Sequence, residues 1–229
     1  MPDTLTLEIE KQAKARGLYD MLEVYYRIRA VGLPGRVDAI FLVPNTQDNE
    51  WSIFTGAKSL EWLSQMFLIL DGAEANGYPG FENWYRRFSD YVNSERIRMV
   101  PIADRHKVNT LSKFKALVPW AMEQGITSVC LVPAPFHYLR SFMTAASVAI
   151  REGVAIGGVP ELRIYTHAGA EQPWDEVVYH SQGTKRNTRR GFVGGELDEI
   201  VKYQRDEKDG LPNSIEPTAR ILEYVGTLA

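Results

Sequence analysis

The chain has 229 residues, of which 45% are hydrophobic, and its 26 basic and 29 acidic side chains give a formal charge of −3. An α/β sheet covered by helices on both faces reaches this length as one domain. The near balance of charge disfavours a general nucleic-acid or anionic-membrane surface, which needs a basic face. We therefore expect a soluble globular protein with no nucleic-acid partner.

Cysteine usage and the absence of targeting segments indicate the compartment. Cys130 is the one cysteine and lies in an apolar run, so we expect a small buried side chain rather than a reactive thiol. The N-terminus lacks the basic start and apolar stretch of a signal peptide. Uninterrupted apolar runs fall far short of the about 20 residues of a membrane span. These features predict a cytoplasmic protein with no membrane span.

The first predicted elements are helical. Apolar residues over 5–30 follow helical spacing, and Gly17 is a point where two helices could divide. A continuous apolar run at 38–44 is typical of a strand buried on both faces of a parallel sheet. The pattern then alternates between helices at 52–65, 81–92, 110–124 and 137–151 and strands at 67–70, 97–102, 128–132 and 162–166. Two further helices are predicted at 195–205 and 215–225.

This alternation predicts a three-layer, Rossmann-like, open and mainly parallel sheet of about five strands with extra terminal helices. We expect one domain, with a helical extension at 1–36, a core at 37–170 and a C-terminal helical part at 171–229. The stretch at 153–160 looks the most flexible but is too short for a domain linker.

Ligands bind such sheets outside the carboxyl ends of the strands, near the point where strand order reverses. The loops that follow the first two strands contain polar or small residues suited to contacting a ligand. The candidate ligand-binding residues in these two loops are Asn45, Thr46, Asp71 and Gly72.

The loop after the fourth strand is the most informative. His137 falls near a predicted helix N-terminus, and Arg140 lies on the same face one turn later. A helix N-terminus beside a cation attracts anions, and histidine exchanges a proton near neutral pH. We predict His137 as a general acid or base and Arg140 as the clamp for an anion. A capping histidine and a solvated arginine are the alternative.

Polar residues also cluster after the third strand. Asp104 is the carboxylate of this loop, and could orient His137 or bind a metal. Lys107, Asn109 and Thr110 are candidate ligand contacts, although Asn109 or Thr110 could instead cap the helix that follows.

These two loops together carry a family resemblance. Asp104-x-x-x-x-Asn109-Thr110, then a helix, a strand and Val132-x-x-x-Phe136-His137-x-x-Arg140-Ser141, resembles the YdcF/SanA/ElyC-like family, bacterial proteins with a domain of unknown function. The match covers roughly residues 38–150. The resemblance implies a Rossmann-like fold with a pocket built from these loops, and it implies no particular reaction. This sequence departs from the family at Asp104, where the family has Glu, at Lys107, where it has Ser, and at Pro133-Ala134, where it has Thr-Ser.

A basic segment stands outside this match. Residues 185–190 contain four cations, including Arg189 and Arg190. Arginine clusters grip phosphate in a forked geometry, so this segment could be a mobile loop that closes over an anionic ligand. An ordinary solvated loop is the alternative.

Two functions remain open at this point. One is an enzyme, either a hydrolase or a transferase, acting on a small anionic or nucleotide-like ligand with His137 and Asp104 as catalytic residues. The other is a non-catalytic module that binds an adenosyl metabolite such as S-adenosylmethionine, which the missing hydroxyls in the fourth loop favour. The sequence has no dinucleotide fingerprint, no Walker motif and no zinc-ligand spacing. It therefore assigns neither a cofactor nor a metal, and it leaves the oligomeric state open.

Overall fold

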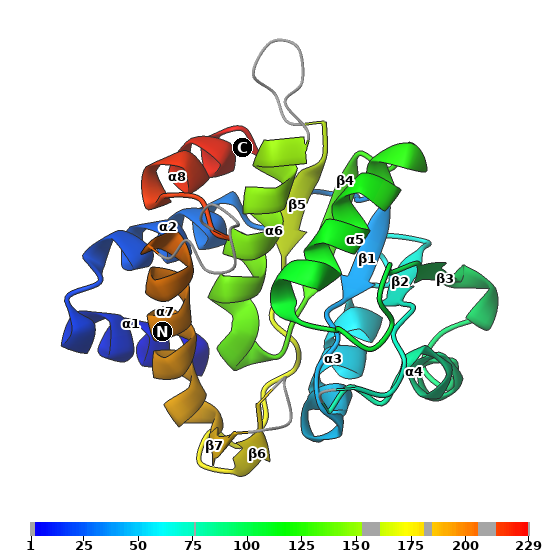
Figure 1. Ribbon diagram of the computed structural model, residues 1–229, viewed down its shortest axis with the longest axis horizontal. Coiled ribbons are helices and arrows are strands. Elements are labelled where there is room, and N and C mark those ends of the chain that lie inside the picture. The colour runs from blue at the N-terminus through cyan, green and yellow to red at the C-terminus, as the bar shows by residue number, and fades with distance from the viewer. Residues whose placement is uncertain (1–2, 76, 153–160, 181–184, 206–213, 229) are drawn as a thin grey trace.

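A five-stranded parallel sheet forms the centre of the protein. The computed structural model describes residues 3–75, 77–152, 161–180, 185–205 and 214–228 (Figure 1). The sheet order is β3-β2-β1-β4-β5, which confirms the predicted Rossmann-like α/β fold. The strands are β1 (Ala39–Leu42), β2 (Phe67–Leu70), β3 (Ile97–Val100), β4 (Ser128–Val132) and β5 (Arg163–Thr166).

The innermost strands are buried on both faces, as their continuous apolar sequence predicts. Every residue of β1, β2 and β4 is buried. In the middle of β1, Ile40 pairs with Phe67 of β2 and with Cys130 of β4. Cys130 is a free, buried thiol, as expected from its place in the strand.

Four helices connect the strands and cover the sheet. α3 (Gln47–Ser59) and α4 (Phe81–Phe88) lead from β1 to β2 and from β2 to β3, the second by way of η1 (Ser94–Arg96). α5 (Thr110–Glu123) and α6 (Tyr138–Glu152) run the other way across the sheet and pack side by side (Figure 1). Because parallel crossovers are right-handed, helices that travel in opposite directions cover opposite faces.

The two ends of the chain come together beside this sheet. α1 (Thr4–Arg16) and α2 (Tyr19–Val31) divide at Gly17, which is left-handed with φ 68°. α7 (Arg189–Arg205) packs against α1, and α8 (Thr218–Gly226) packs against α2. Both α7 and α8 also pack on α6, so the terminal helices form a layer at the β5 side (Figure 1). Within the described ranges, no helix has the length and apolar character to cross a membrane.

The basic segment differs from its prediction as a loop. β7 (Arg186–Thr188) pairs antiparallel with β6 (Val177–Tyr179), and α7 begins directly afterwards. The strand at 163–166 is therefore not the last one, and α7 starts six residues before its predicted position. Arg189 and Arg190, at the start of α7, form ion pairs with Glu176, Glu8 and Asp175 within the fold. The stretch at 153–160, expected to be flexible, lies outside the described residues.

The outer edge of β5 is closed by one side chain. The Tyr224 hydroxyl of α8 accepts a hydrogen bond from the backbone N of Ile164 (2.8 Å) and donates one to the backbone O of Leu162 (2.9 Å). A side chain of a covering helix thereby binds two backbone groups on the outer side of this edge strand.

Replacing Tyr224 with Phe tests this edge. The change leaves the backbone groups of Ile164 and Leu162 buried without their partner, so we expect the free energy of unfolding to fall by about 1–3 kcal/mol. Urea unfolding followed by circular dichroism measures the loss. Tyr19→Phe, on an exposed residue, is the control. Equal unfolding midpoints for both variants would show that the Tyr224 hydroxyl does not stabilise the sheet.

Candidate functional site

The strand order places the candidate site between β1 and β4. From β1 the chain builds the sheet toward β3, and it then crosses back to place β4 and β5 on the other side. The loops after β1 and β4 therefore diverge and leave room for polar side chains at the carboxyl edge. Pro44, Asn45 and Thr46 follow β1, and η2 (Pro135–His137) follows β4.

A buried carboxylate from the C-terminal part lies at the centre of this site. Glu196 of α7 accepts hydrogen bonds from both Nε (2.5 Å) and Nη2 (3.0 Å) of Arg140 in α6. The side chains of Arg140 and Glu196 are 2% and 4% exposed. This forked arrangement is the strongest geometry for a guanidinium and a carboxylate, and it uses both oxygens of Glu196.

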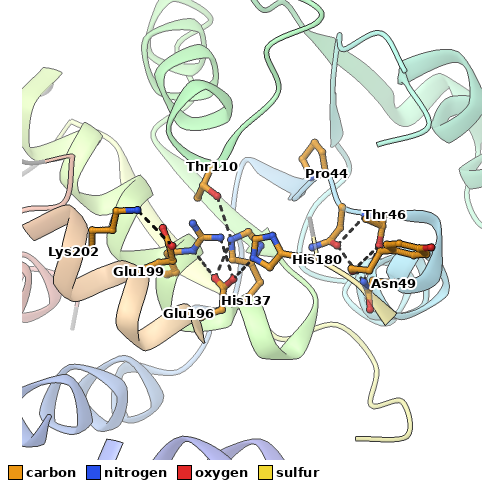
Figure 2. Close-up of polar contacts among 12 residues, drawn as sticks. Pro44, Thr46, Asn49, Thr110, His137, His180, Glu196, Glu199 and Lys202 are labelled. Atoms are coloured by element: carbon orange, nitrogen blue, oxygen red, sulfur yellow. Dashed lines mark hydrogen bonds and ion pairs between the residues drawn. The ribbon is translucent and has the colours of Figure 1, made fainter. Parts of the chain in front are cut away.

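Two histidines face the same carboxylate. His180 Nε2 is 2.7 Å from Glu196 Oε1, and His137 Nε2 is 3.5 Å from Glu196 Oε2 (Figure 2). His137 Nε2 is also 3.4 Å from the Thr110 hydroxyl (Figure 2). The second ring nitrogen of His137, Nδ1, is buried and has no hydrogen-bond partner within the described parts of the chain.

Burial and neighbouring charges have opposite effects on the pKa values of Glu196 and His137. Burial acting alone would raise the pKa of Glu196, but Arg140, with help from His137 and His180, lowers this pKa well below its usual range. Burial lowers the pKa of His137 well below its ordinary value, and Glu196 only partly opposes this. At neutral pH, Glu196 is thus ionised and His137 is a neutral imidazole.

A second buried cation lies close by without a carboxylate partner. Lys113 of α5 is fully buried, and its Nζ donates a 2.5 Å hydrogen bond to the backbone O of Pro44. It forms no ion pair in the part of the chain that the structure describes. Burial, with a contribution from the charge of Arg140, lowers the pKa of Lys113 to about 7. An ammonium held by one backbone carbonyl has unused donors.

The loop after β1 forms a network that reaches the hairpin. Asn45 Oδ1 accepts hydrogen bonds from the Thr46 backbone N (2.9 Å) and from Asn49 Nδ2 (3.2 Å). The Thr46 hydroxyl donates to the backbone O of Tyr179 in β6 (3.2 Å), and Arg189 Nε donates to Asn49 Oδ1 (3.2 Å). Asn45 Nδ2 is buried, and no described residue accepts a hydrogen bond from it. This network leaves another donor free near Lys113, which binds the adjacent residue Pro44.

The structure brings together part of the predicted site. His137, Arg140 and Thr110 join through the contacts around Glu196, and Asn45, Thr46 and Arg189 join through Asn49. Asn109 caps α5 in a reciprocal box with Ser112, so its side chain serves the helix end, one of the two roles expected for it.

Other predicted site residues lie apart from this group. Asp104 is exposed and accepts a hydrogen bond from the His106 backbone N (3.0 Å). No hydrogen bond or ion pair joins it to His137 among the described residues, and Glu196 is the carboxylate that faces this histidine. Lys107 is exposed as well.

The remaining residues predicted to contact a ligand instead make contacts within the protein. Asp71 pairs with Arg105 (2.9 Å), and Arg190 pairs with Glu8 and Asp175. Gly72 is packed so tightly that an added Cβ would lie 2.9 Å from both Tyr78 and Val108. Its role in the structure is close packing.

Sequence reasoning did not place Glu196, His180 or Lys113 in this site, although His180 was noted as a polar residue just before the basic segment. Glu196 lies in the middle of a helix 56 residues after Arg140, and no local pattern links the two. Lys113 did carry a signal, because it follows Thr110 by one helical turn and so shares its face. His180 directly precedes residues outside the described ranges and carries no motif.

No metal centre emerges from this arrangement. In the described part of the chain, no three His, Cys, Asp or Glu side chains are placed to hold a metal ion. Glu196, the carboxylate that both histidines face, is occupied at each oxygen by Arg140.

Comparison with known proteins identifies no family for this chain. No protein-family model matches the chain, and neither curated proteins nor solved structures show a significant match. Fold and site thus define an α/β protein with a Rossmann-like parallel sheet and a polar cluster at its strand ends.

Replacing Arg140 with Met tests the buried ion pair. The change leaves the Glu196 charge uncompensated in the interior, so we expect a loss of about 3–5 kcal/mol in the free energy of unfolding. The double variant Arg140→Met/Glu196→Met removes both charges and is expected to recover most of that loss. Urea unfolding measures all three proteins. Lys58→Met, which breaks an exposed pair, is the control and should cost less than about 1 kcal/mol. Additive losses in the double variant would contradict the coupling.

The Lys113 pKa predicts a pH dependence of stability. Between pH 7 and 10.5, the unfolded chain binds a proton at Lys113 that the folded chain does not. Stability therefore rises with pH across this window, and Lys113→Met lacks this contribution. We expect the stability of the native protein relative to Lys113→Met to increase from pH 7 to pH 10 in urea unfolding. Lys115→Met, which removes an exposed lysine of the same helix, is the control. Parallel curves for native protein and Lys113→Met would contradict this assignment.

Proposed function

We propose that this protein binds a small anion, such as a phosphate, sulfate or carboxylate group, at the carboxyl ends of β1 and β4. The observation that supports the proposal is the burial of Lys113 together with its small number of hydrogen-bond partners. Among the residues that the structure describes, this fully buried lysine has one backbone acceptor and no ion pair with a carboxylate, and Asn45 beside Pro44 offers an unused amide donor.

The charge balance of the buried cluster supports an anion. Lys113 and Arg140 contribute two cationic groups, and Glu196 contributes one negative charge, while His137 is neutral. A buried charge without a counter-ion is costly, so this interior favours an incoming negative group. A bound anion would accept hydrogen bonds from donors that are now unused.

The same geometry favours binding over catalysis. His137 is fully buried and its Nε2 faces Glu196 and Thr110, so its free Nδ1 is the atom left to contact a ligand. Cys130 is no nucleophile, because burial raises the pKa of its thiol. The resemblance to the YdcF-like family agrees with a strand-end pocket. The hydrolase or transferase alternative requires turnover of a phosphate ester, which a phosphate-release assay measures.

A second candidate is an adenosyl metabolite such as S-adenosylmethionine. Asp71 follows β2 at the position where dinucleotide-binding folds place the carboxylate that holds a ribose. That carboxylate is paired here with Arg105, which the ribose would have to displace. Titration of S-adenosylmethionine in the presence and absence of sulfate separates the two candidates.

Sulfate binding measured by calorimetry tests the proposal. Sulfate does not titrate near neutrality, whereas Lys113 has a pKa of about 7 and gains charge as the pH falls. If the anion binds only the charged form, its Kd is roughly tenfold lower at pH 6 than at pH 8. Lys113→Met is expected to weaken binding by at least roughly tenfold, the effect of losing a hydrogen bond between charged groups. Lys115→Met should leave it unchanged. Equal sulfate affinity in the Lys113→Met variant would refute the site.

A further inference from the structure

A separate pocket opens beside α7. It has a volume of about 210 Å³ and lies between α6, α7 and the end of the hairpin. Its lining includes three basic side chains, an aromatic ring and two acidic side chains: Arg140, His180, Lys185, Phe192, Asp198 and Glu199. Lys113 and Asn45 do not line it, so it shares only Arg140 with the donors that define the proposed anion site.

The basic wall can hold a carboxylate. Arg140 uses Nε and Nη2 on Glu196, while its Nη1 makes no hydrogen bond among the described residues. Lys185 is exposed at the same wall. One free guanidinium nitrogen and an ammonium suit a small anionic group.

The acidic wall can hold an ammonium. Asp198 pairs with Arg16 (2.9 Å) and Glu199 with Lys202 (3.7 Å; Figure 2). The Asp198 and Glu199 side chains are 63% and 27% exposed. Ion pairs that water reaches contribute little, so a ligand ammonium can replace the lysine or arginine at small cost.

An apolar surface lies in the same pocket. Phe192 packs its ring against Phe136 (5.3 Å between centroids) and His180 (5.3 Å), and this contact holds it in place. A short methylene chain can lie on such a ring. The volume is below the roughly 300 Å³ at which pockets for drug-sized ligands begin, so a nucleotide does not fit in it.

We propose that this pocket binds a small amino carboxylate. Its carboxylate lies at Arg140 and Lys185, its ammonium at Asp198 and Glu199, and its carbon chain on Phe192. This site does not depend on the sulfate site, because Lys113 belongs only to the latter.

Calorimetric titration with glycine, β-alanine, 4-aminobutyrate and 6-aminohexanoate tests the proposal. Butyrate and butylammonium are the controls, since each carries one of the two charges. We expect at least one amino carboxylate to bind about fivefold or more tightly than either control, the upper range for one solvent-accessible ion pair. Equal binding of butyrate, or no binding across the series, would overturn the proposal.

Variants locate the bound ligand. Glu199→Gln and Asp198→Asn are each expected to weaken the best amino carboxylate by about threefold to fivefold while leaving butyrate unchanged. Glu223→Gln, an exposed acidic residue of α8, is the matched control. Lys113→Met should retain amino carboxylate binding, which separates this outcome from failure of the anion site. Unchanged affinity in both acidic variants would show that the ligand binds elsewhere.

Discussion

The buried ion pair between Arg140 and Glu196 is the interaction on which the rest of the candidate site depends. It joins α6, which belongs to the sheet, to α7, which belongs to the C-terminal part. Without Glu196, the guanidinium of Arg140 would lie in the interior with no counter-ion, and His137 and His180 would lose the carboxylate that both face. Helix α7 is therefore part of the candidate site and not only a cover for it.

Around this pair, the described interior contains two basic side chains, Arg140 and Lys113, and one carboxylate, Glu196. Glu196 forms its ion pair with Arg140, whereas the hydrogen-bond partner of Lys113 among the described residues is the carbonyl of Pro44. The fold tolerates Lys113 because its pKa falls to about 7, so the ammonium can release its proton when the site is empty. Binding of an anion would reverse that change, which links occupancy of the site to proton uptake. The neutral histidine beside it adds no charge to this balance.

Arg140 also connects the interior to the surface. Two nitrogens of its guanidinium, Nε and Nη2, donate hydrogen bonds to Glu196. The same side chain also lines the pocket beside Phe192. In the two proposals, this one side chain contributes both to an inner group of donors and to an outer pocket with both signs of charge. The bidentate ion pair with Glu196 fixes the position of the Arg140 side chain, which is the residue that the two proposed sites share.

The sequence by itself determined the elements and the sheet, because hydrophobic periodicity and caps are local properties. The buried strands, the division at Gly17 and a cap at Asn109 or Thr110 all follow from neighbouring residues, and the structure places the cap at Asn109. Only the tertiary structure decided which charges meet. Glu196 reaches Arg140 across 56 residues, and in the basic segment Arg190 pairs with Glu8 near the other end of the chain. Electrostatic pairing depends on distance in space, which no sequence period encodes.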